Sequence, residues 1–184
     1  MGRCVFAPLP CIEDGVFQRS RWLAPHGLAS LRTLNPVSAA KVSALALRDL
    51  AADVVGKDPV YVASAGPARS ASLMNAWDCE SGYLGITTDA PSFQNQIAAR
   101  FGLKVGLHVP GRRAKEIKAP IFFAICETDT VAPAKASVRH AEKAPLGEIK
   151  VYPFGHFDIY VGEPFEQAVA DYLDFLRRHV PVAV

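Results

Sequence analysis

Two short polar segments follow two apolar stretches in the last third of the chain, and they contain an acid and a base. Residues 126–133 read CETDTVAP and include Asp129, and residues 154–158 read FGHFD and include His156. A carboxylate that accepts a hydrogen bond from one imidazole nitrogen fixes the tautomer and leaves the other nitrogen able to take a proton. The pattern predicts Asp129 as the orienting acid and His156 as the general base and acid of a Ser/His/Asp mechanism.

Taken one at a time, these features also have structural explanations. Asp129 can cap a helix that begins near Pro133, and the histidine can be an exposed loop residue. Gly155 fits a tight turn with positive φ that directs the imidazole ring toward the strand ends. Asp158 and Glu163 follow closely and could form a second pair of carboxylates, but a loop that packs and is solvated is the preferred interpretation.

The nucleophile of such a mechanism is missing from this chain. No G-x-S-x-G motif occurs in the 184 residues. Ser64, Ser70 and Ser72 lie in the segment VASAGPARSAS, which lacks the sharp strand-to-helix turn that exposes a nucleophilic serine. We interpret these three residues as loop serines.

The elements that must position the acid and the histidine are predicted from short apolar runs. The run IFFAIC, residues 121–126, is typical of a strand covered on both faces, which indicates a parallel sheet. Parallel strands are expected side by side, with a helix over residues 163–179 on one face, in the order 4–7, 120–126 and 148–152. Because ligands meet the carboxyl ends of such strands, we expect Asp129 and His156 to lie within hydrogen-bond distance.

The middle of the chain, residues 21–110, reads as mostly helical and irregular. We expect one helix over residues 38–55, with Ser38 as its N-cap and Gly56 as its stop signal. A second helix is predicted over residues 92–101.

The C-terminal segments resemble the end of the α/β-hydrolase superfamily, near its dienelactone-hydrolase and prolyl-peptidase-like branch. The residues that carry the resemblance are 117–133, 155–157 and 163–176, because the family has an acid strand, a histidine strand and a terminal helix in this order. Residues 3–15 resemble the strand that follows the nucleophile strand and helix. The resemblance implies hydrolysis of an ester, lactone or amide, with the serine and the oxyanion groups upstream of Met1.

The implied architecture is a partial α/β-hydrolase fold, in which a parallel sheet flanked by helices carries a mostly helical, lid-like insert. As a single truncated domain, the chain divides into a first core strand and turn (1–20), the lid-like insert (21–110) and a C-terminal core with the acid and histidine loops (111–184). Trp77, Tyr83 and Phe93 either line an acyl pocket beneath the lid or form the lid's own small core.

Composition excludes several other classes of function. The formal net charge of +2 and the scattered basic residues argue against a nucleic-acid partner. Apolar stretches are too short for a membrane span, and the N-terminal run is a poor signal peptide, so a cytoplasmic location is expected. The four cysteines show no metal-binding or redox spacing, and we expect neither metal nor cofactor.

Two functions from different classes remain open. The first is the C-terminal portion of a serine hydrolase that acts on a small-molecule ester, lactone or amide. The second is a non-catalytic α/β module that binds a partner or a small ligand. A sheet truncated before its first strand would also present an unpaired edge, so self-association of the isolated chain is expected.

Overall fold

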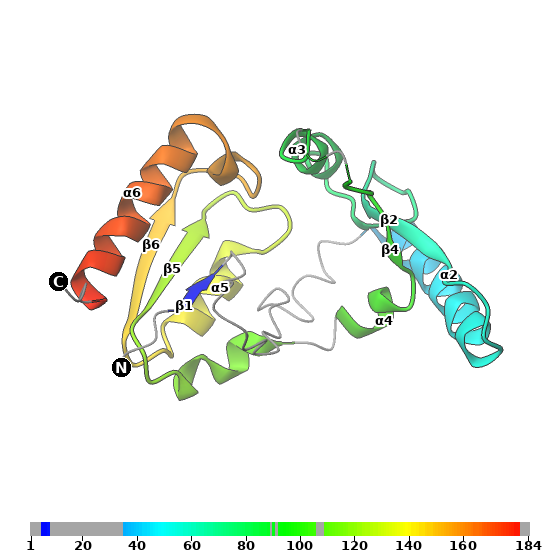
Figure 1. Cartoon of the computed structure of the whole chain (residues 1–184), viewed down its shortest axis with the longest axis horizontal. Helices are drawn as coiled ribbons and strands as arrows, with labels where there is room; N and C mark the ends of the chain where they lie inside the picture. The colour runs from blue at the N-terminus through cyan, green and yellow to red at the C-terminus, as the bar shows by residue number, and fades with distance from the viewer. Residues whose placement is uncertain (1–4, 8–34, 89, 91, 106–108, 181–184) are drawn as a thin grey trace. The chain divides into compact units, whose positions relative to one another are not determined.

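The structure, a computed structural model, describes residues 5–7, 35–88, 90, 92–105 and 109–180 (Figure 1). The chain forms two compact units. The first unit comprises residues 1–26 and 109–184, and the second unit comprises residues 27–108. The predicted turn within residues 8–20 lies outside the described residues, as do Cys4 and Cys11. The role of the middle segment as a lid stays a prediction.

The first unit contains a parallel three-stranded sheet with the order β1-β5-β6. Its strands are β1 (Val5–Ala7), β5 (Ile121–Cys126) and β6 (Gly147–Tyr152) (Figure 1). Along β5, Ile121 lies opposite Val5 on one side and opposite Gly147 on the other. The predicted strands, their direction and their order are therefore confirmed.

Helices cover both faces of this sheet. They are η1 (Pro110–Glu116), α5 (Ala134–Ala141), η2 (Asp158–Tyr160) and α6 (Gly162–His179). The helix expected near Pro133 is confirmed, with Pro133 as its N-cap. The last helix begins at Gly162, whose φ of +59° is accessible to glycine without strain.

Helix α6 is fixed to the sheet by an aromatic core and a polar edge. Phe122 on β5 contacts Tyr172 and Phe175, with ring centroids 5.7 and 5.6 Å apart. The Tyr152 hydroxyl donates to Asp171 Oδ2 at 2.7 Å. Tyr152 and Phe175 are fully buried. On the other face, Ala114, Ile121 and Ala144 form a smaller core beneath η1 and α5.

The first element that the structure describes in the second unit is the long helix α2 (Pro36–Val54). Its N-cap is Asn35, whose Oδ1 accepts from Val37 N at 3.0 Å, so the prediction of Ser38 as N-cap was wrong. Asparagine is as good a cap as serine, and Pro36 is suited to the first helical position, which places the boundary three residues earlier. Gly56, with φ of +68°, ends the helix as predicted.

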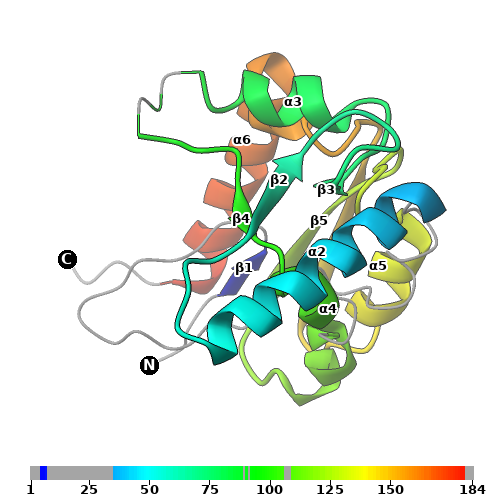
Figure 2. The same ribbon diagram turned by 90° about the vertical axis from the view of Figure 1, so that its right-hand side faces the viewer.

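A small sheet in the second unit was not foreseen from the sequence. Strand β2 (Tyr61–Ala65) pairs in parallel with β3 (Ser72–Met74) and antiparallel with β4 (Ile97–Ala98). Helices α3 (Cys79–Gly85) and α4 (Phe101–Val105) complete the unit, and α2 packs against β2, β3 and α4 (Figure 2).

The helix predicted over residues 92–101 was wrong, because long-range contacts override the local pattern there. Ile97 and Ala98 pair with β2. The Asn95 side chain donates to Ala65 O at 2.8 Å and accepts from Ala65 N at 3.0 Å, which extends the pairing beyond β4. These contacts require extended backbone where a helix was expected.

A buried ion pair connects the elements of the second unit. Asp49 on α2 is fully buried and accepts from Arg100 Nε at 2.8 Å, from Arg100 N at 2.9 Å and from Val60 N at 2.8 Å. The hydrogen bonds from Arg100 lower the pKa of Asp49 to about 2. Asp49 therefore stays ionised and links α2 to the residues next to β2 and β4.

Candidate active site

The pairing of β5 and β6 continues beyond the ends of both strands. Glu127 N donates to Tyr152 O at 2.8 Å, and Thr128 N donates to Phe154 O at 3.2 Å. The loops that follow the two strands therefore begin side by side. This backbone contact brings the residue after Thr128 and the residues after Phe154 to the same edge of the sheet.

At this edge the structure brings Asp129 and His156 together. His156 Nδ1 lies 2.8 Å from Asp129 Oδ2, within the separation expected from the sequence. The other carboxylate oxygen, Oδ1, accepts from Val131 N at 2.8 Å and from Ala132 N. Asp129 is thus held by the backbone on one side and by the imidazole on the other, although it is not the N-cap of α5.

The contact determines which imidazole nitrogen carries the proton in the neutral ring. An ionised carboxylate only accepts hydrogen bonds, so Nδ1 must be the donor to Asp129 and Nε2 the free acceptor. Within the described part of the chain, no group hydrogen-bonds Nε2. The His156 side chain keeps 25% of its surface exposed, against 10% for Asp129. The pair can therefore accept a proton at Nε2 while Asp129 stabilises the resulting imidazolium.

Aromatic residues form one side of the site. The ring of Phe157, which is buried, meets the His156 ring edge to face at 4.8 Å, and Tyr160 lies 6.4 Å from it. Burial, helped by the negative charge of Asp129, raises the pKa of Tyr160 to about 12. Tyr160 therefore presents a neutral phenol at physiological pH.

Gly155 serves the site differently from the prediction. In the described residues, the glycines with positive φ are Gly56 and Gly162, so the expected positive φ at Gly155 was wrong. A Cβ at this position would lie 2.9 Å from Asp158 Oδ2. Glycine is needed here for close approach and not for an unusual backbone conformation.

The remaining acidic candidates do not form a second acid and base pair. Asp158 Oδ2 accepts from Gly155 N at 2.8 Å, so this carboxylate closes its own loop. Glu163 lies exposed in the first turn of α6. The preferred interpretation of this segment as a packed and solvated loop agrees with these contacts.

The three serines considered as nucleophiles belong to the second unit. Ser64 lies within β2 and Ser72 begins β3, so their interpretation as loop serines was wrong and holds only for Ser70. Ser70 Oγ and Ser72 Oγ are 2.8 Å apart, and Ser72 is fully buried. None of the three occupies a turn between a strand and a helix, which is the setting that a nucleophilic serine requires.

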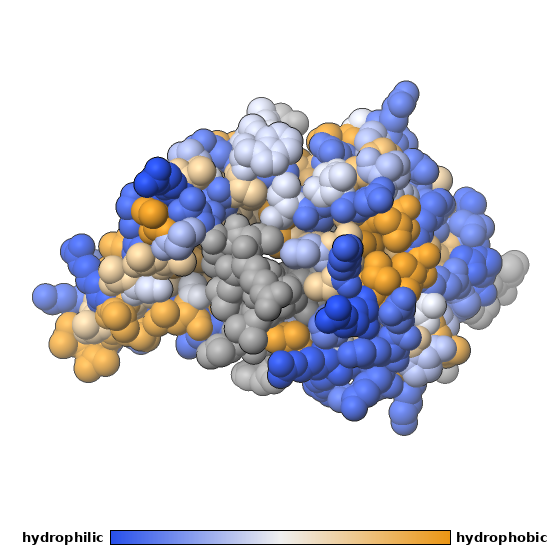
Figure 3. All heavy atoms as spheres, turned by 180° about the vertical axis from the view of Figure 1, so that it is seen from behind, coloured by the Kyte–Doolittle hydropathy of each residue, from blue (hydrophilic) through white to orange (hydrophobic). Residues whose placement is uncertain are grey.

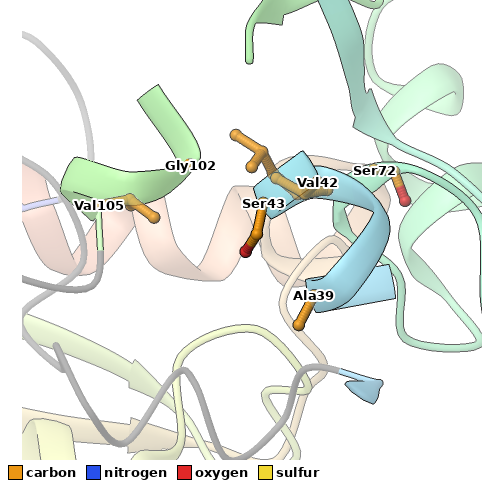
Figure 4. A pocket seen from close by; sticks show the side chains of 7 residues that line it. Ala39, Val42, Ser43, Ser72, Gly102 and Val105 are labelled. Atoms are coloured by element: carbon orange, nitrogen blue, oxygen red, sulfur yellow. The ribbon is translucent and has the colours of Figure 1, made fainter. Parts of the chain in front are cut away.

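The second unit contains a small, mostly apolar pocket of about 80 Å³ (Figure 4). Helices α2 and α4 and strand β3 line it, with the residues Ala39, Val42, Ser43, Ser72, Leu73, Gly102 and Val105. The three aromatic residues predicted to line an acyl pocket are not among them. Tyr83 contacts Phe93 edge to face at 5.5 Å, which favours a small core of the unit itself for these two residues. Trp77 is 87% exposed and belongs to neither this pocket nor this core.

Neither thiol nor metal chemistry is indicated in the part of the chain that the structure describes. Cys79 and Cys126 are buried. Burial raises the pKa of Cys126 to about 11, helped by the negative charges of Asp129 and Asp158, so its thiol stays protonated. No group of three or more His, Cys, Asp or Glu side chains among the described residues is arranged to hold a metal ion.

Basic residues are less scattered in space than in the sequence. Strongly hydrophilic side chains gather over η1, where Arg112, Arg113 and Lys115 are exposed (Figure 3). Arg139, near the end of α5 that packs on η1, is also exposed. The acid and histidine loops begin at the opposite, carboxyl ends of β5 and β6.

Comparison with known proteins finds one close relative and several folds of the same kind, although no protein-family model matches the chain. The chain is 46% identical over 156 residues to the quorum-quenching protein AidA of Acinetobacter baumannii (strain MDR-ZJ06), covering 85% of this chain and 51% of that protein. It resembles DcsB, solved in complex with its substrate analogue, with a TM-score of 0.61 and 21% identity, over 80% of this chain and 53% of DcsB.

A second solved structure agrees with this result. The α/β hydrolase GrgF from Penicillium sp. sh18 matches with a TM-score of 0.52 and 20% identity, over 80% of this chain and 51% of GrgF. The chain thus spans about half the length of these relatives. It has a partial α/β-hydrolase fold, a parallel sheet flanked by helices, and the predicted fold class is confirmed. In the described part of the chain, no helix is both long and apolar enough to cross a bilayer.

Proposed function

We propose that this chain supplies the acid and the histidine of a Ser/His/Asp hydrolase that cleaves an ester, lactone or amide bond. The observation that carries the proposal is the 2.8 Å contact between His156 Nδ1 and Asp129 Oδ2 at the carboxyl ends of two paired parallel strands. The backbone hydrogen bonds to the other carboxylate oxygen support it, because a preorganised carboxylate orients the imidazole before substrate binds.

Each of the two residues has a defined role in this mechanism. His156 Nε2 takes the proton of a serine hydroxyl as that oxygen attacks the substrate carbonyl, and it then gives the proton to the leaving group. Asp129 holds the proton of the neutral ring on Nδ1 and stabilises the imidazolium that forms. General acid–base catalysis of this kind contributes roughly 10²- to 10⁴-fold to the rate.

The nucleophile must come from sequence that this chain lacks. Its 184 residues contain no G-x-S-x-G motif, and the match covers only 51% of the A. baumannii relative. We place the serine and the oxyanion groups in the part of that relative that the match does not cover. By its name, the A. baumannii relative quenches quorum sensing, and the proposal extends to a signalling molecule with one of these three bonds as substrate.

A split-protein experiment tests the proposal. The chain is produced together with the portion of AidA outside the match, and hydrolysis of a nitrophenyl ester, a γ-lactone and a nitroanilide is measured. We expect the pair to hydrolyse at least one of them, and His156→Ala to reduce the rate by about 10²-fold or more. A matched control is His179→Ala, because His179 also contacts a carboxylate, Glu148 Oε1 at 2.8 Å, in the same unit.

Two results would contradict this assignment. An active pair whose rate is unchanged by His156→Ala would remove the histidine from the mechanism. Labelling of the isolated chain by an organophosphonate probe, lost in His156→Ala, would reveal a nucleophile elsewhere in this chain, among Ser64, Ser70, Ser72 or the residues not described.

The absence of the serine motif favours a second candidate, a non-catalytic α/β module that binds a partner or a small ligand. It predicts a stable complex with the other half of the relative and no turnover of any of the three substrates.

Self-association also remains a prediction: among the described residues, β1 pairs only with β5. Sedimentation of a compact monomer at all concentrations would contradict it. A cytoplasmic location rests on the sequence alone.

A further inference from the structure

We propose that Asp158 is a positioning residue for His156, a role that rests on the proposed function of that histidine. Asp158 contacts neither the imidazole nor Asp129 by a hydrogen bond in the structure. Instead its carboxylate and its carbonyl close the loop from which His156 projects.

The first step is the pair of hydrogen bonds that Asp158 makes on both sides of the loop. Its Oδ2 accepts from Gly155 N at 2.8 Å, and its backbone carbonyl accepts from Val161 N at 3.2 Å. A side chain that accepts from the N–H three residues before it has the geometry with which the third residue of a helix reaches back to its cap. The segment from Gly155 to the start of α6 is therefore tied together at one residue.

The second step is the space at Gly155. A Cβ built there would meet Asp158 Oδ2 at 2.9 Å and Asp158 Cγ at 3.6 Å, and Thr128 Oγ1 at 4.0 Å. The carboxylate thus occupies the position that any other side chain at residue 155 would need. The closed loop also lies against the acid loop, because Thr128 N donates to Phe154 O at 3.2 Å.

The third step places His156 between two fixed neighbours. Gly155 is held by Asp158, and Phe157 is buried with 6% of its surface exposed and packs edge to face on the imidazole. Without the Asp158 carboxylate, the N–H of Gly155 loses its acceptor and the loop is fixed on one side only. The ring then departs more often from Asp129, and the preference for a proton on Nδ1 weakens.

Asp158 is exposed and charged, so a direct electrostatic effect on His156 is the competing explanation. Asp158→Asn separates the two, because asparagine keeps an oxygen that accepts from Gly155 but carries no charge. Asp158→Ala removes both. Gly155→Ala leaves the charge in place and displaces the carboxylate by the clash at 2.9 Å.

The test is NMR of the full 184-residue chain with ¹⁵N-labelled histidine at neutral pH. In the native chain we expect His156 to show a single tautomer with a slowly exchanging proton on Nδ1. In Asp158→Ala and Gly155→Ala, exchange of this proton should accelerate by about tenfold, and the other tautomer should become detectable. Asp158→Asn should stay within about twofold of the native rate.

Asp174→Ala is the matched control. Asp174 is an exposed aspartate of the same unit whose Oδ2 accepts from Arg178 Nε at 3.0 Å, away from the histidine loop. Its removal should leave the His156 signals unchanged. Thermal unfolding of each variant shows whether the fold survives, and Gly155→Ala still decides the matter if Asp158→Ala fails to fold.

Two outcomes overturn the proposal. One is a native tautomer and exchange rate in both Asp158→Ala and Gly155→Ala. The other is an Asp158→Asn variant as perturbed as Asp158→Ala, which would assign the effect to charge. Because these measurements need no nucleophile, they stand even if the split hydrolase is inactive. In an active pair, Asp158→Ala should lower kcat with little change in KM.

Discussion

Each of the two units contains a carboxylate that accepts hydrogen bonds from several donors: Asp129 in the first unit and Asp49 in the second. The two carboxylates differ in the side chain that they contact, a histidine for Asp129 and an arginine for Asp49. In the second unit, both oxygens of Asp49 accept from Arg100 and the backbone, and no surface of the side chain is exposed. In the first unit, Asp129 Oδ1 accepts from the backbone and Oδ2 contacts His156, a ring that can change its protonation state.

The difference separates a structural carboxylate from one suited to chemistry. Arg100 cannot lose its proton at physiological pH, so the Asp49 pair can only hold elements together. His156 has a second nitrogen without a hydrogen-bond partner in the described residues, so the Asp129 pair can pass a proton on. By burial and hydrogen bonding alone, Asp49 would be the better candidate for a catalytic carboxylate than Asp129. The identity of the partner side chain reverses that order.

The largest expected effect tests the chemical side of this comparison. In the split protein described above, Asp129→Asn should lower the hydrolysis rate by roughly 10³- to 10⁴-fold, because the carboxamide no longer holds the imidazole in the correct tautomer. The midpoint of thermal unfolding should change little, since the amide oxygen can still accept from the backbone. A rate close to the native value would make Asp129 a purely structural residue like Asp49.

The structural side predicts the opposite result for the second unit. Asp49→Ala leaves Arg100 without its buried partner and removes the acceptor of Val60 N, so the midpoint of thermal unfolding should fall by about 10 °C or more. Asp53→Ala is the control, because Asp53 contacts the same guanidinium but its side chain is 61% exposed. That variant should stay within about 2 °C of the native midpoint. A similar fall of the unfolding midpoint in both variants would show that the burial of Asp49 does not determine its contribution to stability.

Acid unfolding compares the buried pair with an exposed one. Hydrogen bonds from Arg178 lower the pKa of Glu148 from 4.5 to about 2, as Arg100 does for Asp49 from 3.8. Both carboxylates therefore stabilise the fold above their ordinary pKa values, and this stability is lost as the pH falls from about 4.5 to 2. Glu148→Gln should make the stability of the first unit depend less steeply on pH between about 4.5 and 2.

Salt sharpens the same comparison, because it screens exposed charges more than buried ones. Glu148 is 37% exposed and Asp49 is not exposed at all. Acid titrations are monitored by circular dichroism in low and high salt. At high salt, the contribution of Glu148 to the stability against acid should fall, and the contribution of Asp49 should stay almost unchanged. Equal sensitivity to salt would mean that water reaches Asp49 in solution.

The smallest expected effect concerns His140 on α5, a histidine without a carboxylate partner in the described residues. Burial lowers its pKa below 6.5, helped by the positive charges of Lys143, Arg112 and Arg139. Its folded form therefore resists protonation, so stability is complete above about pH 6.5 and declines as the pH falls below that value. His140→Gln should remove a decline of about 1–3 °C between pH 7 and pH 5. A native pH profile in this variant would contradict the assignment.

How much of this molecule could be read from its residues differs between the two units. In the first unit, the run IFFAIC identifies a buried strand and EIKVY identifies the strand beside it. The strand order and the contact of Asp129 with His156 follow from the rule that parallel strands end at one edge. Local pattern and long-range packing agree there.

In the second unit, local pattern was not sufficient. Ser38 and Asn35 are both good N-caps, and only the position of Pro36 separates them. Strands as short as β3 and β4 have too few residues to show an alternation of apolar and polar side chains. They form because their backbones pair with β2. The helix expected over residues 92–101 is replaced by these contacts.

The sequence by itself determined the residue types at the strand ends, and hence the candidate acid and base, because apolar runs and their flanking polar residues are local features. Only the tertiary structure decided how those residues are held: the carboxylate of Asp129 divided between backbone and imidazole, the Asp158 contact that requires Gly155, and the pairing of Asp49 with Arg100, 51 residues away. Such contacts depend on packing between distant segments, where many pairs of similar residues are equally compatible with the local pattern.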